Sequence, residues 1–497
     1  MNMGLFLLSW SPVVLLAVLA VFLRRSALEL SLYGFLFSLL IAIGFFKTSF
    51  AVALLSAVDG VLTTLPLLFV ILGGIFLSSS LTATGSLNRI VEWFKGGAGD
   101  AFGRNVLITF GVGNFMEGAG VIAEPVVAPM LAAAGVSPTG AAALSIIGYS
   151  GLMTLEMAGI IVTVLALVTG LPVADLGMTA AWLSIPATLA MALCVPFFLP
   201  HGAWQIRRLC IILSAGLLAG VTGLASAAFV GVPVAGILAG LAVIFAFILL
   251  GSGRLRMQEG IFADLIPFAF LLICLLCVNV VPFVRTLTFE RLVVKVNFIP
   301  VHAITFRPLF SAYLYLFLAF LISIRLQRVP KKEIQTIFRS GFQRGWRAFA
   351  AMGTFGAMGQ VISYTGYYPG FSGLDVGHNI PWIISQGLAG YTGMFYPLFV
   401  PLLGWVGTFL TGYGVAALML FGQLQVQAAS LLGVSATWLA AGLAVGSSVG
   451  SISSPFKVAL ATSMCGAVGR EGEILRLTIP LGVAASLLVG VVLWLIV

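Results

Sequence analysis

Charged residues are scarce in this chain: Asp, Glu, Lys and Arg make up only 8% of its 497 residues. A soluble domain carries about 25% charged residues, because its surface must face water. Hydrophobic residues make up 61% of the sequence, and apolar runs of about 20 residues, the length that crosses the hydrocarbon core, recur along it. The scarcity of charge excludes a soluble protein. It predicts an all-α polytopic membrane protein with a single transmembrane domain over residues 1–497, whose lasting partner is the lipid bilayer.

Side chains typical of metal centres and enzyme active sites are also few. The five cysteines lie in or beside apolar runs, and the CxxC pair Cys274 and Cys277 has no second Cys or His pair that would complete a metal site. The three histidines fall in predicted loops without ligand-spaced partners, and no glycine-rich phosphate-binding loop ends in Lys-Ser or Lys-Thr. We therefore predict no metal, no cofactor and no enzymatic activity.

The positive net charge of +9 indicates topology and not nucleic-acid binding. The basic residues cluster between apolar runs, where the positive-inside rule places them on the cytoplasmic side of a bacterial cell inner membrane. The clusters are Arg24 and Arg25; Arg89, Lys95 and Arg104; Arg207 and Arg208; Arg254 and Arg256; the seven basic residues from Arg325 to Arg347; and Arg470 and Arg476.

Placing every cluster in the cytoplasm requires an even number of crossings between consecutive clusters. About twelve transmembrane helices satisfy this rule, with both termini outside. The first is expected to be a span and not a removable signal peptide, because no basic residue precedes it and no small-residue cleavage site follows it. The predicted spans are 5–23, 27–46, 61–81, 140–170, 176–199, 209–228, 232–251, 261–282, 309–325, 346–365, 437–468 and 474–497.

Three shorter features complete the predicted topology. Residues 285–308 carry four basic residues but fall outside by parity, and the alternating polarity of LTFERLVVKVNF predicts a small external hairpin. The segment SLNRIVEWFKGG, with Arg89, Glu92 and Lys95, predicts an amphipathic helix on the membrane surface. Asp59 lies near a membrane end and is expected to be interfacial.

Two apolar stretches are broken near their centres. Residues 105–134 are interrupted by the glycines that follow Glu117, and residues 394–432 by the sequence Thr-Gly-Tyr-Gly at 411–414. Each arm has about 15 residues, too few to cross a core that needs about 20. A re-entrant hairpin, with its tip near mid-membrane, explains both stretches. The alternative is a pair of ordinary, glycine-kinked spans in each stretch.

The two broken stretches resemble each other, which indicates an internal repeat. FMEGAGV at 115–121 aligns with FLTGYGV at 409–415, and each stretch precedes an apolar span interrupted by small polar residues. By parity the hairpins enter from opposite sides, as in transporters built from inverted repeats. The predicted units are repeat 1 at about 61–200, connecting helices at about 201–345 and repeat 2 at about 346–497. Helix breaks expose backbone N–H groups that bind anions, so we predict a carrier for a small anion.

Three glutamates are candidates for proton coupling. Glu117 lies at the first tip, Glu124 precedes Pro125, and Glu156 follows the break of the next span. Ionisable groups at membrane depth are expensive and are functional candidates for that reason. Burial disfavours the charged form of a carboxyl group, so such a glutamate can change its protonation near physiological pH. For Glu117 the alternative is a structural role, capping the broken helix.

Lys457 is a candidate anchor for an anion. It follows Ser453, Ser454 and a proline at the break of the second interrupted span, and a cation beside serine hydroxyls at a helix break could hold a carboxylate. The alternatives are a structural pair with Glu156 or Glu124, or a lysine that extends its amine to the membrane surface.

The motifs at these positions resemble the bacterial lactate permease family. The resemblance rests on FMEGAGVIAEPV with AAAGVSPTGAAALSIIGYSG, on LGWVGTFLTGYGVAALMLFGQLQVQAASLLGVS, and on VGSISSPFKVALATSMCGAVGREGEILRLTIP, and it extends over residues 73–170 and 346–497. It implies an inner-membrane, proton-driven symporter for small 2-hydroxymonocarboxylates such as lactate and glycolate. It also places Glu117 and the second tip at the substrate or coupling site. The predicted substrate-binding residues are Gly118, Gly120, Thr411, Gly412, Tyr413, Ser453, Ser454 and Lys457.

The chain departs from the family pattern at its tips. Glu124 stands where the family has a threonine before the proline, and Phe456-Lys457 stand where the family tends to have small polar residues or glutamine. A carrier of another anion, either a sulfonate or a different carboxylate, is therefore an alternative, as is sodium as the coupling ion. A membrane-embedded enzyme that uses Glu117 and Glu124 is a third hypothesis. A homodimer is left open as the assembly.

Overall fold

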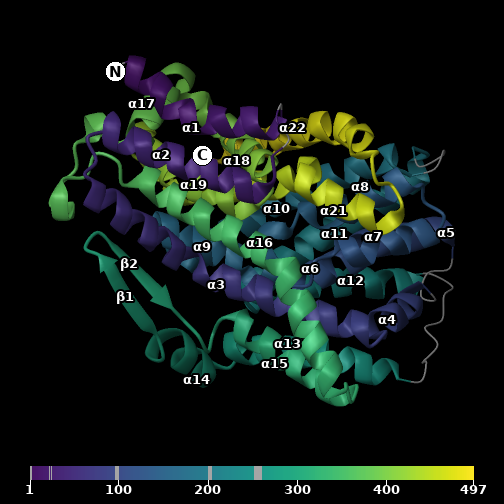
Figure 1. The fold of residues 1–497 in the computed structure, drawn as a ribbon. Helices are drawn as coiled ribbons and strands as arrows, with labels where there is room; N and C mark the ends of the chain where they lie inside the picture. Colours follow the sequence, from purple (N-terminus) through teal and green to yellow (C-terminus); the bar gives the residue numbers. More distant parts are fainter. Residues whose placement is uncertain (1–2, 22, 24, 96–99, 200–203, 251–259) are drawn as a thin grey trace.

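The computed structural model describes residues 3–21, 23, 25–95, 100–199, 204–250 and 260–497. Over these ranges the chain forms a bundle of roughly aligned helices with one two-stranded antiparallel hairpin (Figure 1). Nine of the described helices are long and apolar enough to cross a membrane. An all-α polytopic membrane protein is therefore confirmed, while the count of about twelve spans and the re-entrant path of the hairpins stay predictions.

The helices and strands fall into three consecutive groups. The first group is α1 Met3–Val21, α2 Ala27–Gly44, α3 Phe50–Ala83, α4 Ser86–Lys95, α5 Ala101–Val106, α6 Gly113–Gly118, α7 Glu124–Ala133, α8 Pro138–Ser150, α9 Ile160–Thr169 and α10 Val173–Cys194. The second is α11 Ile206–Phe229, α12 Ala235–Leu250, α13 Ile261–Val280, α14 Pro282–Arg285, β1 Val294–Ile299, β2 His302–Phe306 and α15 Ala312–Leu326. The third is α16 Lys331–Ser363, α17 Ile380–Thr392, α18 Tyr396–Thr411, α19 Gly414–Leu432, α20 Ala436–Val449, α21 Pro455–Cys465 and α22 Glu471–Ile496.

Three helices differ from the predicted spans. Helix α3 begins at Phe50 and not at 61, because the Ser49 side chain accepts a hydrogen bond from the backbone of Val52 and caps a longer helix. Helix α16 begins at Lys331 and not at 346, because its first turns are polar and exposed and an apolar pattern does not detect them. Helix α17 was not predicted at all, although Asn379 caps its first turn at Trp382.

The predicted amphipathic helix is present as α4, and its position on the membrane surface stays a prediction. The Arg89 guanidinium donates to both carboxylate oxygens of Asp264 in α13, at 2.6 and 2.7 Å. The Gln327 amide, just beyond α15, donates to the same carboxylate at 2.7 Å. A bidentate pair of this kind fixes both orientation and distance. It therefore ties α4 to the α13–α15 pair.

The predicted hairpin between 285 and 308 is confirmed as β1 and β2, paired from Val294 opposite Phe306. It lies at the left of Figure 1, and α4 and α5 lie at the opposite end of the bundle. Its position outside the cell stays a prediction. One strand residue, His302, fastens the hairpin to the helices, because its Nδ1 lies 2.7 Å from Asp59 Oδ2 and its Nε2 lies 2.7 Å from the Leu167 carbonyl oxygen.

Asp59 is fully buried within the protein, and its expected position near a membrane end stays a prediction. His302 and Gln360 of α16 both contact its carboxylate and cover it. Burial by itself lowers the pKa of His302, but the hydrogen bond and charge of Asp59 and the Leu167 carbonyl outweigh it and raise the pKa above 6.5. Both ring nitrogens face acceptors, and both can donate only when the ring is protonated.

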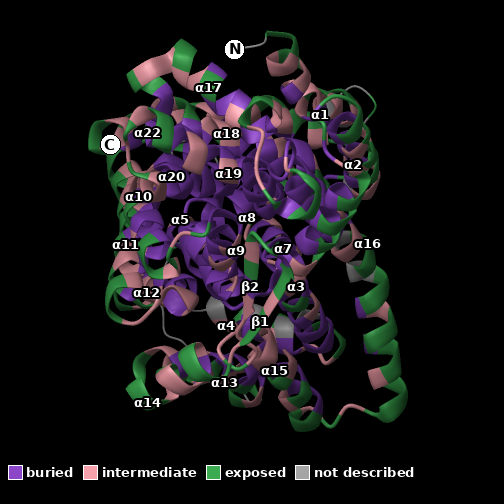
Figure 2. Ribbon diagram, turned by 90° about the vertical axis from the view of Figure 1, so that its left-hand side faces the viewer, coloured by how far each residue is buried: buried purple, intermediate pink, exposed green. Residues whose placement is uncertain are grey.

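The centre of the bundle is formed by the two halves that the sequence relates (Figure 2 shows the buried residues there, with exposed ones on the outer helices). In each half a broken pair of helices, α6–α7 or α18–α19, is followed by an interrupted pair, α8–α9 or α20–α21, and then by a long helix. Matching glycines pack in the same way. A methyl group at Gly148 would overlap the Thr109 carbonyl oxygen, and one at Gly446 would overlap the Pro401 carbonyl oxygen. The inverted orientation of the halves stays a prediction.

The Gly446→Ala variant tests the close crossing of α18 and α20. The added methyl group has no room against the Pro401 backbone, so we expect the free energy of unfolding to fall by about 1–3 kcal/mol. Thermal unfolding in detergent measures this. The matched control is Gly390→Ala in α17, where a methyl group meets nothing within 4 Å. Equal melting temperatures for the two variants would contradict the crossing.

The His302→Gln variant tests the fastening of the hairpin. Because the pKa of folded His302 is raised above 6.5, the stability that its proton contributes is fully present below pH 6.5 and is lost as the pH rises through the raised pKa. We expect wild type to exceed His302→Gln by about 1.5–3 kcal/mol at acidic pH, with the difference shrinking at alkaline pH. Melting temperatures across pH measure it, with His378→Gln as the control. A stability difference between wild type and His302→Gln that does not change with pH would contradict a protonated His302 holding the hairpin to Asp59.

Candidate functional site

Four ionisable side chains lie where the broken segments of the two halves meet. Glu117 ends α6, Glu124 begins α7, Glu156 lies in the break between α8 and α9, and Lys457 lies in the first turn of α21. The three glutamates are almost completely buried, and Lys457 is partly buried. Glu117 interacts electrostatically with Glu124 and Lys457. Glu156 interacts in the same way with Glu117, Glu124 and Lys457. The structure thus brings together every ionisable residue predicted for the site.

The first break is closed by Glu117 itself. Helix α6 ends at Gly118, and the Ala123 backbone N–H, just before α7, donates to Glu117 Oε1 at 2.9 Å. This is the contact that the capping alternative requires. One carboxylate oxygen of Glu117 is therefore committed to the backbone, and that contact fixes the position of the carboxyl group at the tip.

Gly118 and Gly120 face other helices and not the ionisable cluster. A methyl group at Gly118 would overlap the backbone of Gly236 and Ile237 in α12. Gly120 has a φ of +77°, and a methyl group there would lie 3.1 Å from Leu316 of α15. The two glycines allow the tip to approach its neighbours closely, while their contact with a substrate stays a prediction.

Glu124 and Lys457 are joined by a residue that the sequence did not single out, Tyr149 of α8. The Tyr149 hydroxyl donates to Glu124 Oε1 at 2.6 Å and accepts from Lys457 Nζ at 2.9 Å. The ammonium group also lies 4.8 Å from the centre of the Tyr149 ring. Tyr149 is fully buried, so a single phenol connects an acid of the first half to the cation of the second half.

Glu156 lies in the most contorted segment of the site. Met157, Ala158 and Gly159 all have left-handed φ angles of 49°, 54° and 71°, which two of these residues adopt only at a steric cost. Among the described residues, neither carboxylate oxygen of Glu156 has a hydrogen-bond partner, and the side chain is fully buried. A buried carboxylate without partners is unstable as an anion.

The second tip packs against the start of α21. Thr411 accepts a hydrogen bond from the Tyr413 backbone at 3.3 Å, and Gly412 turns the chain with a φ of +85°. The Ser454 hydroxyl donates to the Gly412 carbonyl at 3.5 Å and accepts from the Lys457 backbone N–H at 3.4 Å, which caps α21. The predicted residues of this tip are therefore gathered beside Lys457.

Ser453 points away from the cluster. Its hydroxyl donates to the Thr478 carbonyl oxygen of α22 at 2.7 Å and accepts from the Trp405 indole N–H at 3.2 Å. Both hydrogen-bonding roles of this hydroxyl are therefore filled within the protein. The serine hydroxyls that contact the first half are those of Ser448, which meets Thr154, and Ser451, neither of which was among the predicted substrate-binding residues.

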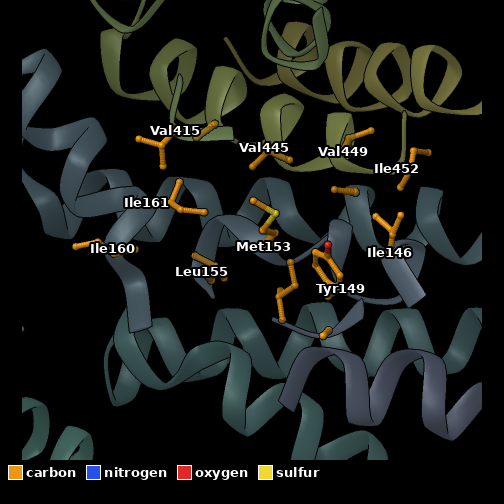
Figure 3. Packing of buried hydrophobic residues seen from close by; sticks show 14 of the residues in the cluster. Ile146, Tyr149, Met153, Leu155, Ile160, Ile161, Val415, Val445, Val449 and Ile452 are labelled. Carbon is orange, nitrogen blue, oxygen red and sulfur yellow. The ribbon is translucent and has the colours of Figure 1, made fainter. Parts of the chain in front are cut away.

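A thioether from the first half lies between donors of the second. Met153 Sδ accepts from Ser451 Oγ at 3.1 Å and from Lys457 Nζ at 3.4 Å. Figure 3 shows Met153 and Tyr149 on the first half, beneath Val445, Val449 and Ile452 of the second. The only sequence signal for either residue is its position within one turn of the break that follows Gly148.

The charge of the cluster is unbalanced. Three acids face one cation, and Lys457 forms no ion pair with any residue that the structure describes. An ammonium group has three N–H donors, and here they meet one phenol and one thioether, which is a weak acceptor. The arrangement can accept an anion at Lys457 and protons at the glutamates. Over the same residues, no group of three His, Cys, Asp or Glu side chains could hold a metal ion.

Comparisons with known proteins place the chain among transporters of small anions. The family described as L-lactate permease matches residues 5–253 and 256–497. The L-lactate permease of Streptococcus iniae is 26% identical over 445 residues, covering 86% of this chain and 91% of that protein. The glycolate permease GlcA of Escherichia coli K12 is 31% identical over 188 residues, covering 38% of this chain and 31% of that protein. The solved YdaH transporter of Alcanivorax borkumensis has 13% identity and a TM-score of 0.43, covering 88% of this chain and 85% of that one, a likeness too low to carry an argument.

The Gly412→Ala variant tests the contact between the second tip and α21. An alanine at a left-handed φ costs about 1–2 kcal/mol, and here its methyl group would also lie 3.1 Å from Cβ of Phe456. The matched control is Gly433→Ala, which has a φ of +68° and nothing within 4 Å of the added methyl group. We expect Gly412→Ala to lower the melting temperature in detergent more than the control does. An equal effect would mean that the tip does not press on α21.

Proposed function

The chain belongs to the L-lactate permease family, and on that premise we propose that it is a secondary active symporter that carries a small 2-hydroxymonocarboxylate, such as lactate or glycolate, together with protons. Family membership makes it a transporter of small organic anions and argues against the alternative of a membrane-embedded enzyme. Its proposed place is the inner membrane of a bacterial cell, which it crosses many times. The observation that carries the proposal is the partly buried Lys457, which has no ion-pair partner among the described residues and lies where the halves meet.

The carboxylate of the substrate is proposed to bind at Lys457. In the present arrangement the ammonium group and the Ser451 hydroxyl both donate to the sulfur of Met153. A carboxylate is a much stronger acceptor than a thioether, because a hydrogen bond gains strength when its partners are ionised. Methionine is flexible, so its side chain can give way. The anion would then replace the sulfur atom between the two donors.

Protons are proposed to enter with the anion because of the three glutamates. An anion that approaches Lys457 also approaches Glu117, Glu124 and Glu156, and like charges in a medium of low dielectric constant repel strongly. Protonating these acids removes the repulsion. Binding of the anion therefore favours binding of protons, and by linkage protons favour the anion to the same extent.

Uptake into proteoliposomes tests the proposal directly. The purified protein would be given labelled lactate, glycolate, a dicarboxylate and a sulfonate, with and without an inwardly directed proton gradient. We expect gradient-driven accumulation of the 2-hydroxymonocarboxylates only. Accumulation that requires sodium and ignores the proton gradient would replace the proton with sodium as the coupling ion. Preference for the sulfonate would change the substrate class.

The Lys457→Gln variant tests the anion anchor. A hydrogen bond to a charged group contributes about 1.5–3 kcal/mol, so we expect the apparent KM for lactate to rise at least about tenfold. Initial rates of uptake over a range of lactate concentrations measure it. The control is Lys331→Gln at the exposed start of α16, which removes the same charge far from the cluster. An unchanged KM in Lys457→Gln would rule out the anchor.

A further inference from the structure

We infer that the hydroxyl group of Tyr149 couples binding of the substrate anion to binding of a proton. In the empty carrier the hydroxyl donates its hydrogen bond to Glu124, and once Glu124 is protonated it donates that hydrogen bond to the anion instead. The inference rests on the proposed function and concerns how the same site links the anion to the proton. Tyr149 is a positioning residue in this scheme, because it stays neutral and transfers no proton of its own.

Tyr149 lies between the carboxylate of Glu124 and the ammonium group of Lys457. Its hydroxyl makes two hydrogen bonds, one to Glu124 Oε1 at 2.6 Å and one from Lys457 Nζ at 2.9 Å. Glu124 and Lys457 have no direct ion pair among the described residues, so the phenol is the link between them. The side chain is fully buried, and bulk water does not compete for the hydroxyl.

A hydroxyl has one proton to donate, and that limit produces the coupling. While Glu124 is ionised, the phenolic O–H donates a charge-assisted hydrogen bond to its carboxylate and stays directed toward it. The phenol then turns its oxygen, and not its proton, toward Lys457. An anion that binds at Lys457 would meet an oxygen lone pair of Tyr149, and would also meet the negative charge of Glu124.

A proton from the aqueous phase reverses this arrangement. When it binds Glu124, the new carboxyl O–H can donate to the Tyr149 oxygen, and the phenolic O–H is free to turn toward the anion. The only covalent bond that forms is the O–H bond on Glu124, and the phenol keeps its proton throughout. The loaded site then has one donor more and one negative charge less than the empty site.

The groups that face Tyr149 all agree with this scheme. Glu117 of α6, Glu124 of α7 and Glu156 of the following break act on it from the first half, and Lys457 of α21 acts on it from the second. The remaining acceptor beside Lys457 is the sulfur of Met153, which carries no charge. Of the three acids, Glu124 alone is hydrogen-bonded to the phenol.

The Tyr149→Phe variant separates coupling from packing, since it keeps the ring and removes only the hydroxyl. In wild type we expect the apparent KM for lactate to rise by at least about tenfold from acidic to alkaline pH. In Tyr149→Phe the KM should depend on pH markedly less than in wild type, because only the direct repulsion between the glutamates and the anion remains. The matched control is Tyr396→Phe, which removes an equally buried hydroxyl that donates to Gln425 at 3.0 Å and lies outside the cluster. That control should keep the pH profile of wild type.

The Glu124→Gln variant tests the same step from the other side. Its side-chain amide can donate to the Tyr149 oxygen as a protonated carboxyl would, so lactate should bind with a low apparent dissociation constant that depends on pH less than in wild type, where Glu124 adds to the repulsion by Glu117 and Glu156. Stabilisation of the detergent-solubilised protein against heat by lactate measures binding even where transport has stopped. This second readout decides the matter if Tyr149→Phe fails to fold.

Two results would overturn the inference: a wild-type pH dependence of KM in Tyr149→Phe, or a wild-type pH dependence of lactate binding in Glu124→Gln. Failure of the underlying proposal looks different, because wild type itself would then show no proton-dependent uptake of any monocarboxylate.

Discussion

The rest of this structure depends on one constraint: where a helix is broken, backbone N–H and carbonyl groups lose their partners within the helix and need others. In a membrane an unpaired N–H or carbonyl group is costly, and irregular backbone is tolerated only where protein or water surrounds it. The chain closes its breaks with its own side chains: Glu117 accepts from Ala123, Thr411 from Tyr413 and Ser454 from Lys457. The breaks must therefore be enclosed by other helices, and the two halves enclose them by facing each other. The site results from this packing.

Close packing around the breaks makes the site sensitive to charge. Three acids and one amine lie in buried surroundings, where an unbalanced charge is costly because water does not solvate it. Two other buried carboxylates are balanced within the protein: Asp59 pairs with His302, and Asp264 pairs with the partly exposed Arg89. These two pairs hold peripheral elements to the bundle, whereas the central cluster keeps an excess of acids.

The sequence predicted the breaks well because glycine, proline and small polar residues interrupt long apolar runs visibly. It placed Glu117, Glu124, Glu156 and Lys457 in one site, and the structure brings them together. The predicted resemblance to the lactate permease family is confirmed over nearly the whole chain. Apolar periodicity gives no information about contacts between residues far apart in the chain.

Two kinds of feature were missed for that reason. Asp59 and His302 lie 243 positions apart, and no local pattern in the sequence indicates that they pair. The direction of a side chain at a break is equally hidden, since it depends on the turn. Ser453 faces Trp405 and α22, whereas Ser451 faces Met153 in the first half. Tyr149, with an ordinary aromatic signature in an apolar span, gave no sign that it joins the two charges.

Tyr149 connects two residues that would each be costly alone. Glu124 and Lys457, taken separately, would each place a charge in the core. The structure shows them at the two ends of one hydroxyl. An acid and a base that share a neutral bridge partly compensate each other in charge, while Glu117 and Glu156 leave the cluster with an excess of acids. Glu124, Tyr149 and Lys457 therefore form one hydrogen-bonded unit, and a substitution of any one of them changes the surroundings of the other two.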